Sequence, residues 1–98
     1  MSNYLLKLYI AGRTPRTERA ILTLQRLCEE YLKGRYELVI IDLLEKPHLA
    51  ELDNVLATPT LIRELPLPRR RVIGDLSDTQ RILSALGLDV SSAGGGFR

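Results

Sequence analysis

Sulfur is scarce in this 98-residue chain, which contains one cysteine, Cys28, and one methionine. A single cysteine cannot form an internal disulfide bond, and a two-thiol redox reaction needs a second cysteine close by. We therefore expect a reducing, cytoplasmic setting and exclude dithiol redox activity.

Aromatic side chains are also few: the chain has four tyrosines, one phenylalanine and no tryptophan, and its one histidine is His48. Proteins that hold single-stranded nucleic acid stack its bases on aromatic rings, and a net charge of +2 is too small to indicate nucleic acid by itself. His48 stands alone as a candidate ligand, whereas metal and catalytic sites need several converging groups. We expect no nucleic-acid partner, no metal and no cofactor, with His48 at the surface.

Long apolar runs and phosphate-binding glycine motifs are missing as well. No run of about 18 apolar residues could span a membrane, and MSNYLLKLYI lacks the basic leader and cleavage site of a signal peptide. The three glycines at 94–96 follow no strand and precede no helix. We predict one domain over residues 1–90 and a flexible tail over residues 91–98.

The first half of the chain carries a strong strand and helix pattern. Tyr4 to Ile10 is nearly all apolar, which favours a central strand. Thr14 or Thr17 can cap the next helix, and Gly34 is placed to end it. The apolar stripe of that helix comprises Ala20, Ile21, Leu24, Leu27, Cys28, Tyr31 and Leu32. Tyr36 to Leu44 reads as a second strand, so this half predicts a parallel β-α-β unit.

The second half has shorter segments interrupted by prolines. We predict a short helix at roughly His48 to Leu56, and a strand at Thr60 to Leu65 directly after Pro59. A further strand starts at Arg71, and the prolines at 66 and 68 predict a tight antiparallel connection to it.

The C-terminal end of the pattern is ambiguous. Ser77 and Gln80 have the spacing of a capping box, which predicts a last helix that ends at Gly87. Leu86, Leu88 and Val90 also alternate, so a strand from residue 85 to residue 91 is the alternative.

The predicted order β-α-β-α-β-β-α, with Pro59 just before the third strand, is the minimal thioredoxin-like α/β arrangement. A thioredoxin needs a thiolate at the start of its first helix, but the turn at residues 12–17, GRTPRT, has no sulfur. Cys28 lies on the apolar stripe and is best interpreted as a buried hydrophobe. A thiol oxidoreductase is therefore the least favoured function.

Positive charge gathers at two places, residues 69–71 (RRR) and around the first strand and helix, where Lys7, Arg13, Arg16 and Arg19 lie. A solvated sheet edge is the more frequent explanation of such a run. A surface for an anionic partner is the alternative.

Several stretches of the chain resemble the KaiB family of circadian-clock proteins. They are YLLKLYIAG at residues 4–12, Thr14-Pro15, IDLL at residues 41–44, LATPTL at residues 56–61 and IGDLS at residues 73–77. The resemblance runs in one register from about Tyr4 to Leu83. The thioredoxin-like sensor domain of SasA histidine kinases is a related group, normally joined to a kinase that is not present here.

The resemblance implies a non-enzymatic timing protein that binds the ring of a KaiC-type ATPase. It would modulate the phosphorylation and ATPase cycle of that ring and compete with a SasA-like sensor. It also implies a metamorphic fold, whose C-terminal half rearranges and assembles into a dimer or tetramer; two such packings need differ by only on the order of a few kcal/mol. A thioredoxin-like adaptor that docks a histidine kinase or a stress partner is the alternative.

Residues carried over from the family fall into two sets. The KaiC-facing set is Pro47, His48, Leu49, Leu52, Asp53 and Val55, together with the basic residues Lys7, Arg19, Arg70 and Arg71. The cis-proline and switch set is Thr58, Pro59, Ala85 and Gly87. Glu37 and Val39 match the place where KaiA would bind, but cyanobacterial members carry lysine at the position of Val39, which makes KaiA a doubtful partner.

Two departures from the family pattern carry expectations. The chain ends soon after Val90, where cyanobacterial members continue into an acidic tail, and this indicates a short-tailed or non-cyanobacterial member, such as one in a KaiC-only partnership. Ala85 aligns with a family glycine in one register; in another register the glycine is Gly87. Alanine inside a helix is favoured over glycine by roughly 1 kcal/mol. We therefore predict that the thioredoxin-like state is more populated here than in a typical cyanobacterial member.

Overall fold

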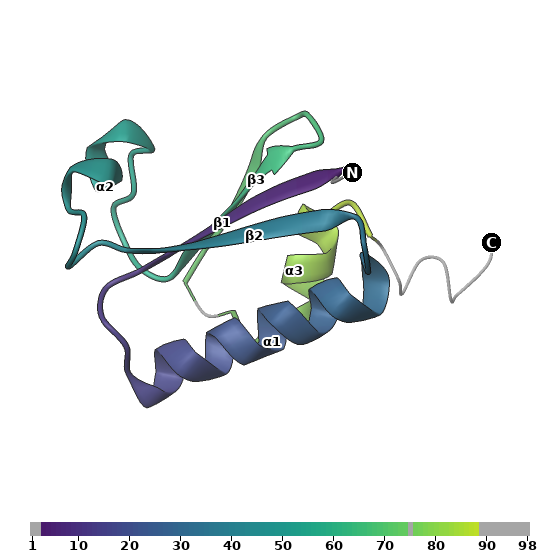
Figure 1. The fold of residues 1–98 in the computed structure, drawn as a ribbon, viewed down its shortest axis with the longest axis horizontal. Helices are drawn as coiled ribbons and strands as arrows, with labels where there is room; N and C mark the ends of the chain where they lie inside the picture. The colour runs from purple at the N-terminus through teal and green to yellow at the C-terminus, as the bar shows by residue number, and fades with distance from the viewer. Residues whose placement is uncertain (1–2, 75, 89–98) are drawn as a thin grey trace.

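The computed structural model describes residues 3–74 and 76–88, and its elements follow the order β-α-β-α-β-β-α (Figure 1). The elements are β1 (Tyr4–Ile10), α1 (Pro15–Tyr31), β2 (Tyr36–Asp42), α2 (His48–Leu52), β3 (Thr60–Leu65), β4 (Arg70–Ile73) and α3 (Thr79–Ala85). The predicted thioredoxin-like order is confirmed. The predicted tail at residues 91–98 lies outside the described residues.

One four-stranded sheet in the order β2-β1-β3-β4 forms the centre of the molecule. β1 pairs parallel to β2 and antiparallel to β3, and β3 pairs antiparallel to β4. Lys7 lies between Val39 on β2 and Ile62 on β3. Because side chains alternate along a strand, Lys7 and Tyr9 point to one face of the sheet and Leu6 and Leu8 to the other.

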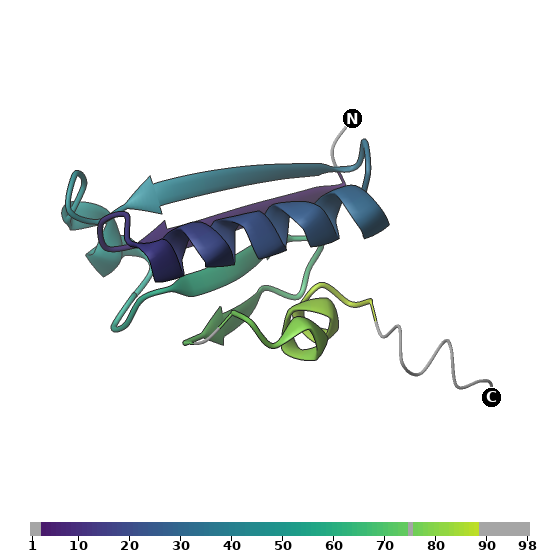
Figure 2. The same ribbon diagram turned by 90° about the horizontal axis from the view of Figure 1, so that it is seen from below.

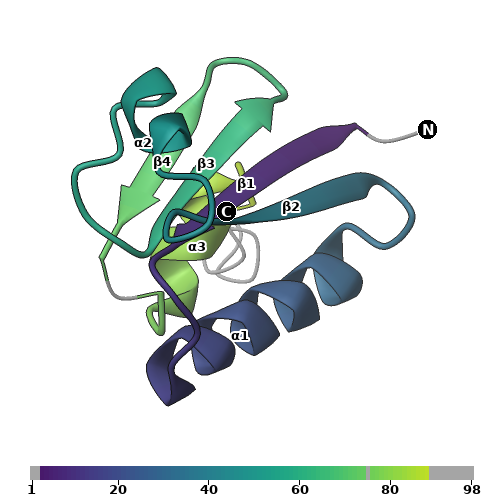
Figure 3. The same cartoon turned by 60° about the vertical axis from the view of Figure 1, so that its left-hand side comes forward.

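The two faces of the sheet are covered unequally. α1 and α3 lie together on one face, whereas α2 lies over one end of the other (Figures 1, 2 and 3). The main core lies under α1 and α3, with Leu6, Leu8, Leu24 and Ile82 fully enclosed. A smaller cluster under α2 consists of Tyr9, Val55 and Ile62, with Ile41, Leu43, Leu49 and Ala50 packed against it.

Helix α1 follows the predicted pattern closely. Thr14 is the N-cap, and its hydroxyl oxygen accepts a hydrogen bond from the Thr17 amide at 3.1 Å. The predicted stripe is inward-facing: all of it is buried except Tyr31, which is half-buried and packs against the core. The helix ends at Tyr31, and Gly34 follows with a φ of +77°, the left-handed conformation that glycine adopts without a steric cost.

Two elements end earlier than predicted. β2 ends at Asp42 rather than residue 44, because the Asp42 carboxylate accepts hydrogen bonds from the amides of Gly12 and Leu44, each at 2.9 Å. These bonds turn the chain out of the strand. α2 ends at Leu52 rather than residue 56, and the following Asn54 has a φ of +53°, which no helix can contain.

The capping prediction for the last helix was wrong by one residue. Asp78, not Ser77, is the N-cap of α3, and its carboxylate accepts from the Arg81 amide at 3.3 Å. Residues 79–85 are helical and residues 86–88 are not strand, so the alternative strand fails where it can be checked; its residues 89–91 lie outside the described residues. Gly87 follows the helix with a φ of +80°, as predicted for a terminating glycine. None of the helices among the described residues is long and apolar enough to cross a membrane.

Candidate partner-binding face

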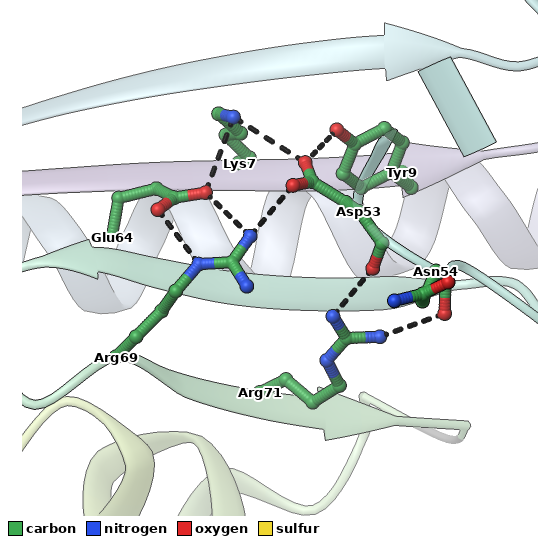
Figure 4. Close-up of polar contacts among 7 residues, drawn as sticks. All are labelled: Lys7, Tyr9, Asp53, Asn54, Glu64, Arg69 and Arg71. Carbon is green, nitrogen blue, oxygen red and sulfur yellow. Dashed lines mark hydrogen bonds and ion pairs between the residues drawn. The ribbon is translucent and has the colours of Figure 1, made fainter. Parts of the chain in front are cut away.

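The side of the sheet that carries α2 presents a cluster of charged side chains from four separate segments (Figure 4). We call this side the α2 face; it comprises Lys7 and Tyr9 of β1, Ile62 and Glu64 of β3, Arg71 of β4, and the segment 43–56 that contains α2. The side chain of Arg69, in the turn before β4, reaches the edge of the α2 face. These segments lie apart in the sequence, and the pairing of the strands brings them together.

Asp53 and Glu64 are bridged by two cations. The ammonium nitrogen of Lys7 lies 3.3 Å from Asp53 Oδ2 and 3.1 Å from Glu64 Oε2. The guanidinium of Arg69 donates to Asp53 Oδ1 at 2.7 Å and to both oxygens of Glu64, at 2.8 and 2.9 Å. The Tyr9 hydroxyl also donates to Asp53 Oδ2. This set, Lys7, Tyr9, Asp53, Glu64 and Arg69, is the charge network of the α2 face.

Arg71 fixes the backbone that follows α2. Its guanidinium donates to the carbonyl oxygens of Asp53 at 2.5 Å and Asn54 at 3.0 Å (Figure 4). The next residue, Val55, is buried against Tyr9 and Ile62. The end of α2 is therefore held by a side-chain carboxylate, by backbone carbonyls and by an apolar anchor.

The network favours the charged forms of Lys7, Asp53 and Glu64 and the neutral form of Tyr9. Burial would lower the pKa of Lys7, but hydrogen bonds to Glu64 and Asp53 outweigh it, so the pKa is raised. Burial would raise the pKa of Asp53, but hydrogen bonds from Tyr9 and Lys7 lower it overall. Hydrogen bonds from Arg69 lower the pKa of Glu64. Burial, together with Asp53, raises the pKa of Tyr9 to about 12, so its hydroxyl remains a donor at neutral pH.

Large apolar side chains around α2 remain exposed. Leu52 at the end of the helix is 73% exposed, and Leu56 in the following loop is 93% exposed. Leu44, before the helix, is exposed to the same degree as Leu52. Exposed apolar surface rimmed by polar residues is a feature of sites of protein–protein interaction. The α2 face thus combines exposed leucine side chains with charged side chains that are held in place.

Most of the carried-over KaiC-facing residues meet on this face. Pro47, His48 and Leu52 are exposed, whereas Leu49 and Val55 point into the small cluster under α2 and position the segment. Lys7, Asp53 and Arg71 take part in the contacts described above. Sequence reasoning missed Tyr9, Glu64, Arg69, Leu44 and Leu56; the alternation of β3, which places Glu64 beside Lys7, was the available signal.

Two basic residues of the same predicted set lie elsewhere. Arg19 is on α1, which covers the opposite face, and it lines a cavity there. Arg70 alternates with Arg71 on β4, so its side chain lies on the α3 side, in a shallow depression with Gln80 and Arg81. The basic residues that look like one patch in sequence therefore divide between the two faces.

The predicted switch residues occupy two sites. Thr58 and Pro59 precede β3, and the peptide bond between them is cis, as predicted from the thioredoxin-like order. Ala85 is the last residue of α3, and Gly87 lies two residues beyond it. Glu37 and Val39, which match the KaiA position, lie on β2, an edge strand of the sheet.

No thiolate is available at the start of α1. Cys28 is fully buried in the main core, and burial together with the charge of Glu29 raises the pKa of its thiol to about 12. Among the described residues, no group of three or more histidine, cysteine, aspartate or glutamate side chains could hold a metal ion. Fold and site thus define a thioredoxin-fold protein whose prominent surface is suited to protein contact, not to redox chemistry.

Comparison with known proteins identifies the family. The KaiB domain model matches residues 7–88. The circadian clock oscillator protein KaiB of a Prochlorococcus marinus strain is 55% identical over 87 residues, covering 89% of this chain and 75% of the relative. That of Synechococcus elongatus is 54% identical over 87 residues, covering 89% and 83%. The chain belongs to the KaiB family, whose members are non-enzymatic clock proteins.

Solved structures agree on the fold. The N-terminal domain of Synechococcus elongatus SasA superposes with a TM-score of 0.76 at 20% identity, covering 99% of this chain and 91% of that domain. Mitochondrial thioredoxin 3 of Saccharomyces cerevisiae gives a TM-score of 0.66 at 19% identity, covering 89% and 80%. At such identities the likeness concerns the thioredoxin-like fold alone.

Proposed function

We propose that this protein binds the ring of a KaiC-type ATPase through its α2 face. Binding modulates the phosphorylation and ATPase cycle of the ring and displaces a SasA-like sensor. The protein acts in the cytoplasm, in keeping with its single buried thiol. The observation that carries the proposal is the pair of exposed leucines, Leu52 and Leu56, on a segment that the charge network holds in place.

The charge network supports this proposal by reducing the entropy that is lost on binding. An interface gains affinity when its contact residues are ordered before the partner arrives. Asp53 and the Arg71 contacts order the end of α2, which presents Leu52 and Leu56 in one arrangement. We assign Asp53 and Arg71 primarily a positioning role.

A residue that positions the surface is a poor choice for testing the surface itself. Replacing Asp53 by lysine would leave Lys7, Tyr9 and Arg69 without their shared acceptor and would disturb the fold as well as the surface. Arg71→Ala would likewise free the loop that follows α2. Loss of binding in either variant would not separate contact from structure.

The double variant Leu52→Asp/Leu56→Asp tests the surface itself. Both side chains are exposed, so the fold should tolerate the change. Two leucines buried at an interface contribute about 1.5–3 kcal/mol each, so we expect at least roughly a hundredfold weaker binding to a KaiC-type ATPase. Leu22→Asp is the matched control, because Leu22 is 64% exposed on α1 at the opposite side.

Binding is measured by size-exclusion chromatography and interferometry with a KaiC-type ATPase in ATP and in ADP. The wild-type chain, mixed beforehand with the KaiC-type ATPase, should keep a SasA-like sensor domain from binding that ATPase. The double variant should not. The proposal fails if the double variant and Leu22→Asp bind equally well. KaiA is not part of the proposal, because this chain has Val39 at the β2 position where cyanobacterial members carry lysine.

We also infer that the C-terminal half, from β3 onwards, rearranges into the alternative KaiB arrangement and then self-associates. Ala85 is the last residue of α3, so the helix-interior value of roughly 1 kcal/mol is an upper limit for its preference over glycine. Ala85→Gly should therefore increase the rearranged population by less than about fivefold. NMR spectra of the wild type and the variant measure both populations; a wild type seen only in the rearranged tetramer would contradict the predicted larger thioredoxin-like population.

A further inference from the structure

A cavity of about 500 Å³ opens on the side of the sheet opposite the α2 face. It lies between the first half of α1, the loop at Thr58 and Pro59, and the segment from Leu76 to Thr79. We call it the α1 pocket. Its volume lies within the roughly 300–1,000 Å³ that is usual for small-molecule sites.

Three arginines of α1 line one wall of the α1 pocket: Arg16, Arg19 and Arg26. Their spacing of three and seven residues places them on one side of the helix, with Thr23 between the last two. Among the described residues no aspartate or glutamate lines the cavity. Arg16 and Arg19 form no ion pair within that part of the chain, and Arg26 has only an exposed pair with Glu30 at 3.7 Å. The wall is therefore positively charged.

Hydroxyl groups and apolar atoms complete the lining. Thr58 and Thr79 line the wall that faces α1, and Ile10, Ala20 and Leu76 are the apolar residues of the lining. Guanidinium groups and hydroxyls are the donors that bind phosphate and carboxylate oxygens. Apolar surface next to them accommodates the carbon skeleton of an organic molecule.

The start of α1 does not itself supply the binding groups. The Thr14 hydroxyl oxygen already accepts from the Thr17 amide, which caps the helix. The side chains of the arginine wall therefore carry the charge of the site.

We propose that the α1 pocket binds a small organic anion that bears phosphate or carboxylate groups, with the guanidinium groups of Arg16, Arg19 and Arg26 holding those groups. This site is separate from the α2 face and does not depend on the proposed KaiC-type partner. Occupation of the pocket would bridge α1 to the Thr58 loop and to the segment before α3.

NMR titration of the ¹⁵N-labelled chain at constant ionic strength tests the proposal, with sodium pyrophosphate as the phosphate probe and citrate as the carboxylate probe. We expect saturable shifts of the amides of Thr23, Thr58 and Leu76, and none at Leu56 on the α2 face. Arg16→Gln/Arg26→Gln should weaken binding roughly tenfold or more, because two charge-assisted contacts are lost. Neither residue belongs to the proposed partner surface.

Lys33→Gln/Arg35→Gln is the control, since it removes the same charge at the far end of α1, outside the pocket. Affinity within about twofold of wild type in this control shows that net charge is not responsible. A response to pyrophosphate alone or to citrate alone supports the proposal and identifies the anion class. Shifts that do not saturate with either probe, or equal weakening in the two double variants, overturn it. Because neither double variant alters the α2 face, binding to a KaiC-type ATPase is scored independently.

Discussion

Replacing Lys7 by methionine measures how much the charge network stabilises the fold. Lys7 lies 3.3 Å from Asp53 and 3.1 Å from Glu64, and the three side chains are 29%, 13% and 19% exposed. Partly buried contacts of this kind contribute about 0.5–1 kcal/mol each. Arg69 still bridges the two carboxylates in the variant. We therefore expect a loss of about 1 kcal/mol, which lowers the melting temperature of a domain of this size by roughly 4–8 °C.

The loss should depend on pH in a defined direction. The folded-state pKa of Asp53 lies below its ordinary value of 3.8, and that of Glu64 below 4.5. Carboxyl groups with lowered pKa values stabilise the fold above their ordinary pKa and lose that contribution as the pH falls through the lowered value. The difference between wild type and variant should be constant around neutral pH and shrink below about pH 4. On the alkaline side it should be fully present below 10.5, the ordinary pKa of Lys7, and be lost as the pH rises from there through the raised folded-state pKa.

Urea denaturation from about pH 7 to about pH 2 provides the measurement, at two protein concentrations so that self-association is detected. Lys33→Met is the matched control, because Lys33 is exposed beyond the end of α1 and away from the network; a surface change of this kind should stay within about 0.5 kcal/mol. An equal loss at both ends of the pH range, or an equal loss in the control, would refute the assignment of the effect to the carboxylates.

Two further predictions concern the backbone and the thiol. Gly87→Ala should destabilise the fold by about 1–2 kcal/mol in urea denaturation, because φ is +80° and the new Cβ would meet Arg63 Nη1 at 3.1 Å. Gly34→Ala, with a φ of +77° and nothing within 4 Å, isolates the backbone cost; an equal loss in both would show that Arg63 yields freely. Cys28, with its pKa raised to about 12 by burial and Glu29, should resist a thiol reagent in the native chain and react fully in denaturant. Rapid native labelling, or turnover in an insulin-reduction assay, would contradict the buried, non-redox assignment.

Local periodicity accounts for the elements that could be predicted. The spacing of Ala20, Leu24 and Leu27 describes one face of α1, and the structure buries all three against the sheet. Boundaries were harder to predict, because distant partners decide them: Asp42 ends β2 by binding the Gly12 amide, thirty residues away in the sequence.

The candidate site depended even more on long-range contacts. Lys7 is 46 positions from Asp53 in the sequence and farther still from Glu64, and nothing in their local pattern indicates that they touch. The resemblance to KaiB named Lys7 and Asp53 without their shared contacts. Glu64 and Arg69 were not among the residues carried over from the family, and the β3–β4 register was needed to find them.

By itself, the sequence determined the thioredoxin-like order, the absence of paired thiols and the family, because these depend on residue types and on short-range spacing. Tertiary structure alone decided which residues share a surface. Arg19 and Lys7 belong to one family patch in sequence. In the structure, Arg19 lies on α1, on one side of the sheet, and the Lys7 side chain points to the other side, where the α2 face lies. Salt screens exposed charges beyond about 8–10 Å, so the fold determines what each basic residue can bind.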